Sequence, residues 1–206
     1  MRVTIIGSTG RIGSHALTAA LAAGHDVTVL NRRPAAAGGV REIVGDPGSA
    51  LSVREAVAGA DAVISALGPR SNRQADEDAL ERAMQVLVAA MTEHRVRRLV
   101  ALSGAGVDVA GDHKPAIDRL VSRFVRVAAR HVVAAKQREF AVLSGADLDW
   151  TALRPAIVTD GAARGYRLSL DLRPGARTTR ADVGQALCDQ LTDSTFVRQA
   201  PFVLPL

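Results

Sequence analysis

The chain has 206 residues, of which 48% are hydrophobic, and this size and composition fit one globular domain with a real core. No apolar run is long enough to span a bilayer, and the first residues lead into a strand pattern rather than a signal peptide. The single cysteine, Cys188, excludes a disulfide framework and a cysteine-based metal cluster. We therefore expect a cytoplasmic protein with no metal site and no membrane partner.

The formal net charge is +5, and nearly all of the basic charge is arginine, since lysine occurs only at Lys114 and Lys136. A basic balance can indicate an anionic partner, such as nucleic acid or a phosphorylated ligand. It can also reflect a biased genome composition. Because the arginines are scattered and no helix-turn-helix pattern accompanies them, we expect no nucleic-acid partner.

Strand and helix patterns alternate along the whole chain. Strands are expected over residues 2–6, 27–30, 41–44, 61–67, 97–102, 148–153, 166–170 and 202–204, the last as an edge strand. Helices are expected over 10–23, 51–58, 75–94, 115–144 with a break near 129–131, and 181–191 with residue 179 or 180 near its cap.

This alternation predicts a Rossmann-type α/β fold, with a doubly wound, mostly parallel sheet of six to eight strands and helices on both faces. Residues 1–206 are expected to form a single domain. Its last part, about 155–206, is expected to form a small substrate-side portion.

A glycine-rich segment joins the first strand to the first helix: Gly7, Ser8, Thr9, Gly10, Arg11, Ile12 and Gly13. A helix N-terminus offers unpaired N–H groups and a partial positive charge, which attract a diphosphate. Gly7 would permit the tight turn, Gly10 the close approach of phosphates, and Gly13 the close packing of the helix on the sheet. The glycine spacing differs from the usual dinucleotide fingerprint, so the position between strand and helix carries the inference that residues 7–13 bind a dinucleotide.

The end of the second strand indicates which dinucleotide binds. Enzymes that use NAD usually carry an acidic residue there to hold the ribose 2′-hydroxyl, whereas this chain has Asn31, Arg32 and Arg33. A guanidinium can bind the 2′-phosphate of NADP through two parallel hydrogen bonds. We therefore predict that NADP(H) is preferred over NAD(H), with Arg32 as the main contact and Arg11 within reach of the same phosphate. The alternative is that Arg32 and Arg33 are simply solvated.

Small and apolar residues follow the next two strands. Asp46 comes after the third strand, and Ala66, Leu67 and Gly68 end the fourth. All of them should lie at the carboxyl edge of the sheet, next to the topological switch point, and form the wall behind the adenosine and ribose.

With these motifs the chain resembles the atypical short-chain dehydrogenase/reductase superfamily, most closely the NAD(P)H-binding group of NmrA-like proteins and the biliverdin reductase B/flavin reductase type. The resemblance covers nearly the whole chain and rests on residues 7–13, 45–46, 101–106, 148–155 and 179–183. It implies that Ser103 and Lys136 contact the cofactor and take part in catalysis, and that Pro155 also lies beside the cofactor.

Standard members of that superfamily combine such a serine with a Tyr-x-x-x-Lys pair, in which the tyrosine transfers a proton. Four residues before Lys136 this chain has Val132, and its only tyrosine, Tyr166, lies well downstream. His113 and His131 are candidate replacement acids, although a lone histidine is more often an ordinary surface residue. Arg154 could orient a carboxylate or a ribose, or could be structural.

Two functions remain open. The first is an NADPH-dependent oxidoreductase that reduces a planar acceptor, such as a flavin or a quinone, without the usual dyad, because an electron-poor acceptor can take protons from solvent. The second is a non-catalytic, redox-sensing NADP(H)-binding regulator of the NmrA-like type. The small size favours the first and the missing tyrosine the second, while a sugar-nucleotide epimerase would need both the tyrosine and a larger lobe.

The partner in the first case is a small-molecule acceptor, in a pocket built from residues 104–114, 155–165 and 72–76. The protein is expected to be a monomer or a homodimer, and the dimer would pair the 115–144 stretch through Phe124 or Val125.

Overall fold

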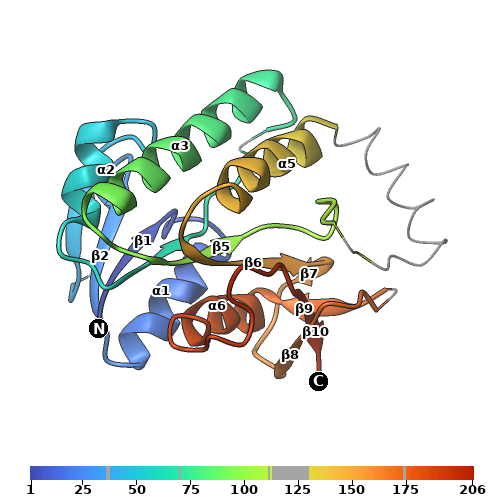
Figure 1. The fold of residues 1–206 in the computed structure, drawn as a ribbon. Helices are drawn as coiled ribbons and strands as arrows, with labels where there is room; N and C mark the ends of the chain where they lie inside the picture. Colours follow the sequence, from blue (N-terminus) through green and yellow to red (C-terminus); the bar gives the residue numbers. More distant parts are fainter. Residues whose placement is uncertain (36–37, 70, 111, 113–129, 174) are drawn as a thin grey trace.

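A computed structural model describes residues 1–35, 38–69, 71–110, 112, 130–173 and 175–206. Its main feature is an eight-stranded sheet in the order β3-β2-β1-β4-β5-β6-β10-β8, in which all neighbouring strands are parallel except β10 and β8 (Figure 1). The strands are β1 Arg2–Ile6, β2 Asp26–Asn31, β3 Arg41–Val44, β4 Ala62–Ser65, β5 Arg98–Leu102, β6 Asp149–Pro155, β8 Tyr166–Ser169 and β10 Phe202–Pro205.

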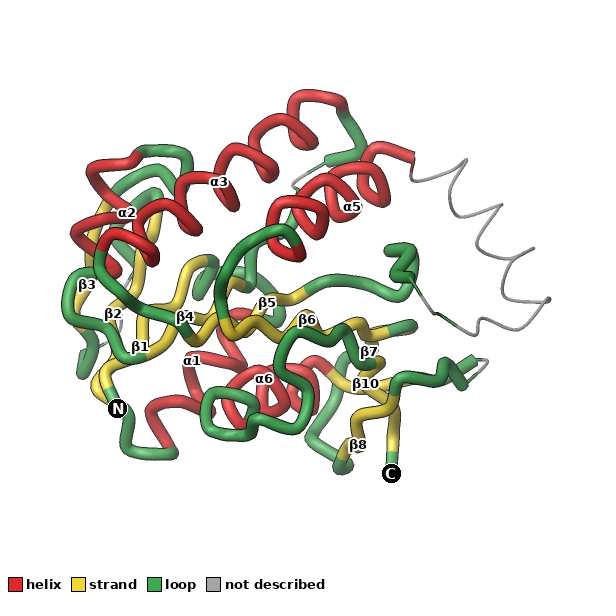
Figure 2. The backbone as a smooth tube through the Cα atoms, viewed as in Figure 1, coloured by secondary structure: helices red, strands yellow, loops and turns green. Residues whose placement is uncertain are grey.

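Helices cover both faces of this sheet, as Figure 2 shows. On one face lie α2 (Ala50–Val57), α3 (Gln74–Glu93) and α5 (Arg130–Ser144), and on the other α1 (Gly13–Ala22) and α6 (Arg180–Asp189). Each layer has its own apolar core, so neighbouring residues of one strand, such as Val63 and Ile64, join opposite cores. The predicted Rossmann-type fold is confirmed.

Parallel strands that are covered on both faces consist of continuous apolar runs, and β1 shows this pattern. It lies between β2 and β4, where Ile5 is paired with Val29 on one side and Ile64 on the other. All three residues are fully buried. The strand order therefore reverses at β1 and β4, and the carboxyl ends of these two strands form the switch point that the sequence indicated.

Several predicted elements differ from the observed ones. The first helix begins at Gly13 rather than Gly10, because residues 8–12 form turns. β10 is not an edge strand: it lies between β6 and β8, and Phe202, Val203 and Leu204 are all buried there. The strand at this edge of the sheet is β8, and β3 lies at the opposite edge.

Two short strands were not predicted. β7 (Ile157–Thr159) and β9 (Arg177–Thr179) form a separate parallel pair, and three residues are too few to give a recognisable alternating pattern. Of the predicted 115–144 helix the structure describes only Arg130–Ser144, and the candidate residues His113, Phe124 and Val125 lie outside the described residues.

A glycine sets the spacing between α1 and α6. A Cβ atom on Gly184 of α6 would stand 2.5 Å from the Cβ of His15 and 2.8 Å from the backbone nitrogen of Ala16. Both contacts are shorter than packed side chains tolerate, so the two helices depend on this residue for their close approach.

We predict that Gly184→Val destabilises the protein by roughly 3 kcal/mol, since overpacking forces the two helices apart. Chemical denaturation of both forms measures this loss. The matched control is Gly104→Ala, where an added Cβ meets nothing within 4 Å. Equal stability of Gly184→Val and the wild type would contradict the packing described.

Candidate functional site

The glycine loop is folded tightly against the end of β4. Gly7 has a φ of +89°, and a Cβ atom there would stand 2.9 Å from the backbone carbonyl of Ala66. A Cβ on Gly13 would stand 2.0 Å from the carbonyl oxygen of Gly7, and that same oxygen accepts a hydrogen bond from the Gly10 N–H at 3.0 Å. Gly7 and Gly13 are therefore required by contacts within the protein, whereas Gly10 meets only the Gly7 oxygen, at 3.1 Å.

The helix that follows offers its N-terminus to an anion. α1 has no side-chain cap and no acidic residue in its first turn. Its partial positive charge is therefore not neutralised by a carboxylate on the helix itself, which is the arrangement found at phosphate-binding helix N-termini.

Hydrogen bonds connect this loop to the end of β2. The Ser8 hydroxyl donates to the Asn31 Oδ1 at 2.8 Å, and the Asn31 Nδ2 donates to the Glu42 Oε1 at 2.7 Å. Ser8 and Asn31 are both buried, while the next residues, Arg32 and Arg33, are exposed. The buried pair thus fixes the point at which the arginine segment leaves the sheet.

One pocket beside the start of the arginine segment is lined by four of the predicted cofactor-binding residues: Arg32, Asp46, Leu67 and Gly68. The pocket lies between the segments that follow β3 and β4 and the first turns of α3, and it encloses about 490 Å³, part of it open to solvent. Its lining residues are Arg32, Asp46, Pro47, Gly48, Leu67, Gly68, Pro69, Asp76, Ala79, Leu80 and Ala83. Arg33 is not among them.

A dinucleotide fits this arrangement. The glycine loop offers a backbone cradle that a side chain on Gly10 would fill, and the pocket offers apolar walls such as Leu67 and Leu80 for an adenine ring. Arg32 at the pocket supplies a cation. Figure 1 shows the loop before α1 and the segments after β2 and β4 gathered at the same edge of the sheet.

Lys136 lies deep between α5 and the sheet. Its Nζ donates to the carbonyl of Leu67 at 2.6 Å, to the carbonyl of Leu102 at 2.7 Å and to the Glu139 Oε2 at 2.6 Å. An ammonium group has three hydrogen atoms, so these contacts use all of them. Burial raises the pKa of Glu139, and the charge of Lys136 opposes this shift. The sequence had no signal for the role of Glu139.

Ser103 directly follows β5. Its N–H donates to the carbonyl of Leu153 at 2.8 Å, which extends the pairing of β5 with β6. Its Oγ is buried, and among the described residues it has no hydrogen-bond partner. The hydroxyl is therefore one of the few buried polar groups left unsatisfied within the described residues.

The sequence left two roles open for Arg154, orienting a ligand or stabilising the fold, and the structure favours the second. It is 1% exposed, and its two terminal nitrogens bind the two carboxylate oxygens of Asp112 at 2.6 and 2.7 Å. Its Nε donates to the carbonyl of Ala200 at 2.7 Å, and its guanidinium lies 3.9 Å from the centre of the Phe202 ring. It therefore ties the segment after β5 to β6 and β10.

Of the two histidines considered as replacement acids, the structure describes His131, and it is bound to a carboxylate. The Nδ1 of His131 lies 2.5 Å from the Oε1 of Glu77, which connects α5 to α3. The Tyr166 hydroxyl donates to the Oδ2 of Asp189 at 2.5 Å. The pKa of Tyr166 is raised, mainly by burial and in addition by the nearby Asp189 carboxylate. Tyr166 lies on the edge strand β8 and attaches that strand to α6.

None of the helices that the structure describes is long and apolar enough to cross a membrane. Within the same described residues, no three His, Cys, Asp or Glu side chains come together as a metal site.

We predict that Gly10→Ala leaves the fold intact and weakens NADPH binding at least about tenfold, because the added methyl group occupies the phosphate cradle. Gly13→Ala should reduce both stability and binding, since its Cβ collides with the Gly7 carbonyl. Calorimetric titration and thermal denaturation of both variants separate the two effects. Unchanged NADPH affinity in Gly10→Ala would argue against the loop as the phosphate site.

We also predict that Lys136→Met destabilises the protein by about 3–5 kcal/mol, because it leaves the Glu139 carboxyl buried without its partner. The double variant Lys136→Met/Glu139→Leu should recover much of this loss. Denaturation measures both. A Lys136→Met protein with wild-type stability and no turnover would instead show that Lys136 acts in the reaction.

Solved structures of known proteins show the same fold. A protein of Burkholderia pseudomallei, provisionally described as exported, is 27% identical, with 99% of each chain covered and a TM-score of 0.79. ChuY, an anaerobilin reductase of Escherichia coli O157:H7, is 20% identical over 100% of this chain and 97% of its own, with a TM-score of 0.81. A short-chain dehydrogenase/reductase of Veillonella parvula in complex with NADP is 22% identical over 98% and 93%, with a TM-score of 0.74.

The sequence itself matches the NAD(P)H-binding family over residues 7–194. This range begins at the first glycine of the loop and includes the pocket that Arg32 lines, Ser103 and Lys136. The match confirms the predicted NAD(P)H-binding family, and the chain belongs to that family.

Proposed function

We propose that this protein is an NADPH-dependent oxidoreductase that reduces a planar acceptor, such as a flavin or a quinone. The observation that carries the proposal is that the glycine loop lies beside a pocket lined by Arg32. NADPH, when bound, supplies a hydride, and the protein's part is to hold the cofactor and orient the acceptor.

Cofactor choice depends on the segment after β2. Arg32 lines the pocket, and residues 31–33 contain no carboxylate that would repel a 2′-phosphate. The carboxylate of Glu42 on β3 binds the Asn31 side chain and the Ala35 N–H, so it shapes the segment that presents Arg32. These contacts support a preference for NADP(H) over NAD(H).

The chain's own residues favour an acceptor that needs no protein acid. Position 132 holds valine, the Lys136 ammonium is fully hydrogen-bonded, and Tyr166 is bound to Asp189. Ser103, with its buried and unpartnered hydroxyl, can hold a ribose or acceptor oxygen in place. A reduced flavin or quinone then takes its protons from solvent, whereas a ketone would need a positioned donor.

The same observations keep a second function open. A redox-sensing regulator of the NmrA-like type would also bind NADP(H) and would need no proton donor. For either function we propose a cytoplasmic monomer or homodimer, with a small-molecule acceptor as the partner in the first.

We predict that Arg32→Ala lowers the preference for NADPH over NADH by about 10- to 100-fold, because a charge-assisted pair with the 2′-phosphate is lost. The matched control, Arg33→Ala, should change it much less, since Arg33 does not line the pocket. Titration of both cofactors into both variants measures the preference. If Arg32→Ala kept the wild-type ratio, the assignment of Arg32 would be wrong.

We predict that the wild-type protein oxidises NADPH when supplied with FMN, FAD, menadione or dichlorophenolindophenol. The loss of absorbance at the nicotinamide band measures turnover. Tight binding of NADPH with no turnover of any of the four acceptors would reject the oxidoreductase and favour the regulator.

A further inference from the structure

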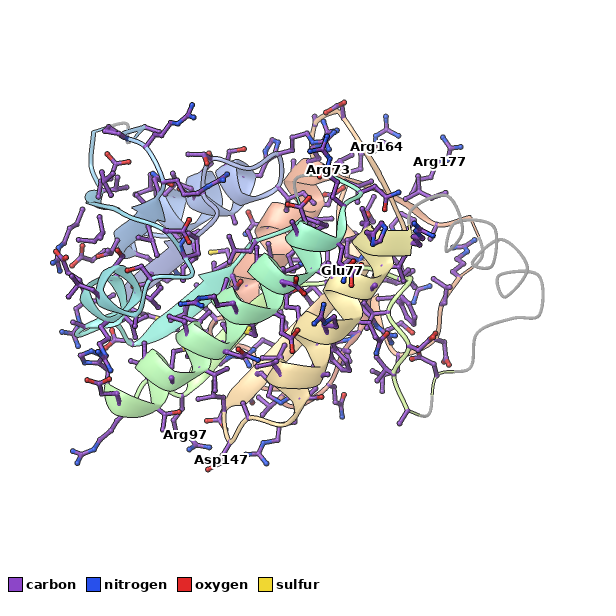
Figure 3. All side chains as sticks on the ribbon, turned by 90° about the horizontal axis from the view of Figure 1, so that it is seen from above. Arg73, Glu77, Arg97, Asp147, Arg164 and Arg177 are labelled. Atoms are coloured by element: carbon purple, nitrogen blue, oxygen red, sulfur yellow. The ribbon has the colours of Figure 1, made fainter. Side chains whose placement is uncertain are left out.

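Two exposed arginines on the C-terminal part of the chain have no ionic partner among the described residues. Arg164 lies in the segment between β7 and β8, and Arg177 begins β9. Among the residues that the structure describes, neither guanidinium binds a carboxylate, whereas the neighbouring Arg180 pairs with Asp160. In Figure 3 both side chains, together with Arg73, lie at one end of the molecule, opposite Arg97 and Asp147. This end is the carboxyl edge of the sheet, because Arg73 directly precedes α3 and Arg97 precedes β5.

A buried carboxylate fixes the backbone that carries Arg164. The N–H groups of Arg164 and Gly165 both donate to the Oδ1 of Asp182 at 3.0 Å. Asp182 is 2% exposed and also forms the capping box of α6 with Thr179. Burial alone would raise the pKa of Asp182, but these hydrogen bonds outweigh it and hold that pKa below its usual value. The segment is therefore held in one place while its arginine side chain is exposed.

The second arginine lies beside an apolar side chain. Ile157 and Arg177 are register partners in the parallel pair β7 and β9, so their side chains share one face. Ile157 is 43% exposed, while on the other face Val158 packs against the core shared by α1 and α6 and Thr178 is buried. The outer face thus presents a branched apolar group next to a guanidinium, two residues after the end of β6 at Pro155.

The two arginines belong to one small substructure. Gly161 lies against Thr179, where a Cβ would meet the Thr179 Cγ2 at 3.9 Å, and Asp160 pairs with Arg180. The segment of residues 160–165 therefore runs along the end of β9. The cofactor's phosphates have their own site in the glycine loop and at Arg32, on the far side of β1.

We propose that Arg164 and Arg177 form an oxyanion subsite for the acceptor, with Ile157 contacting its ring system. The proposal rests on the proposed function and narrows the substrate class to planar acceptors that carry a phosphate or carboxylate group. Two exposed guanidinium groups that no carboxylate of the described residues binds can hold such a group with charge-assisted hydrogen bonds.

The test compares acceptors that differ only in the anionic group. FMN and riboflavin share a ring and differ by a phosphate, and a linear tetrapyrrole and its methyl ester differ by their free carboxylates. Binding of each acceptor to the NADP⁺-loaded protein is followed by fluorescence, a measurement that does not require turnover. The double variant Arg164→Gln/Arg177→Gln is compared with Arg95→Gln, which removes an exposed arginine at the other end of α3.

We expect the wild type to prefer the anionic member of one pair, and the double variant to lose about tenfold or more of that affinity. The uncharged member and NADPH should bind the double variant as they bind the wild type, and Arg95→Gln should change nothing. The pair that shows the loss identifies the oxyanion as phosphate or carboxylate.

Two results would overturn the subsite: a wild type without preference for either anionic member, or a double variant that keeps the preference. If the protein binds the anionic acceptor more tightly but does not reduce it, the result counts against the proposed oxidoreductase function and leaves the subsite standing.

Discussion

Close contact between the glycine loop and the end of β4 is the constraint on which the rest of the site depends. Gly13 lies so near the Gly7 carbonyl that a Cβ atom would be 2.0 Å from its oxygen, and a Cβ on Gly7 would be 2.9 Å from the Ala66 carbonyl. These contacts place the N-terminus of α1 directly over the carboxyl ends of β1 and β4. The phosphate cradle, the arginine after β2 and the pocket after β4 can then serve one extended ligand, because all of them meet at this edge.

Two groups of basic side chains differ in what binds them. Lys136, Arg154 and Arg98 are buried or half-buried, and backbone carbonyls or carboxylates accept their hydrogen bonds. They hold strand ends and loops together and have little capacity left for a ligand. Arg32 and Arg164 are exposed, and within the described residues no carboxylate binds either guanidinium, so both are available to an anion. A positive net charge alone could not separate these groups.

Much of the architecture could be predicted from the sequence, because hydrophobic periodicity and glycine positions are local signals. The succession of strands and helices along the chain up to β6, the glycine loop and the pocket residues Arg32, Asp46, Leu67 and Gly68 are of this kind. The placement of β10 between β6 and β8 depends on long-range pairing, and the three-residue strands β7 and β9 depend on their contacts with each other. Neither leaves a pattern in the sequence.

The hydrogen-bond partners of the side chains could not be predicted either, because they too depend on long-range contacts. The bonds of Arg154 to Asp112 and of Asn31 to Ser8 join residues far apart in the chain. Lys136 and Glu139 are only three residues apart in the chain. The hydrogen bonds that occupy the Lys136 ammonium also include the carbonyls of Leu67 and Leu102, which only the fold brings close to it. A lysine at a family's catalytic position is therefore not enough to assign its role.

A crystal structure of the protein with NADP⁺ bound tests the central claim most directly. The account predicts the diphosphate against the Gly10 backbone at the start of α1, the adenine in the pocket beside Leu67, and the 2′-phosphate in contact with Arg32. Density for the dinucleotide elsewhere on the molecule, or a 2′-phosphate that points into solvent away from Arg32, would contradict it.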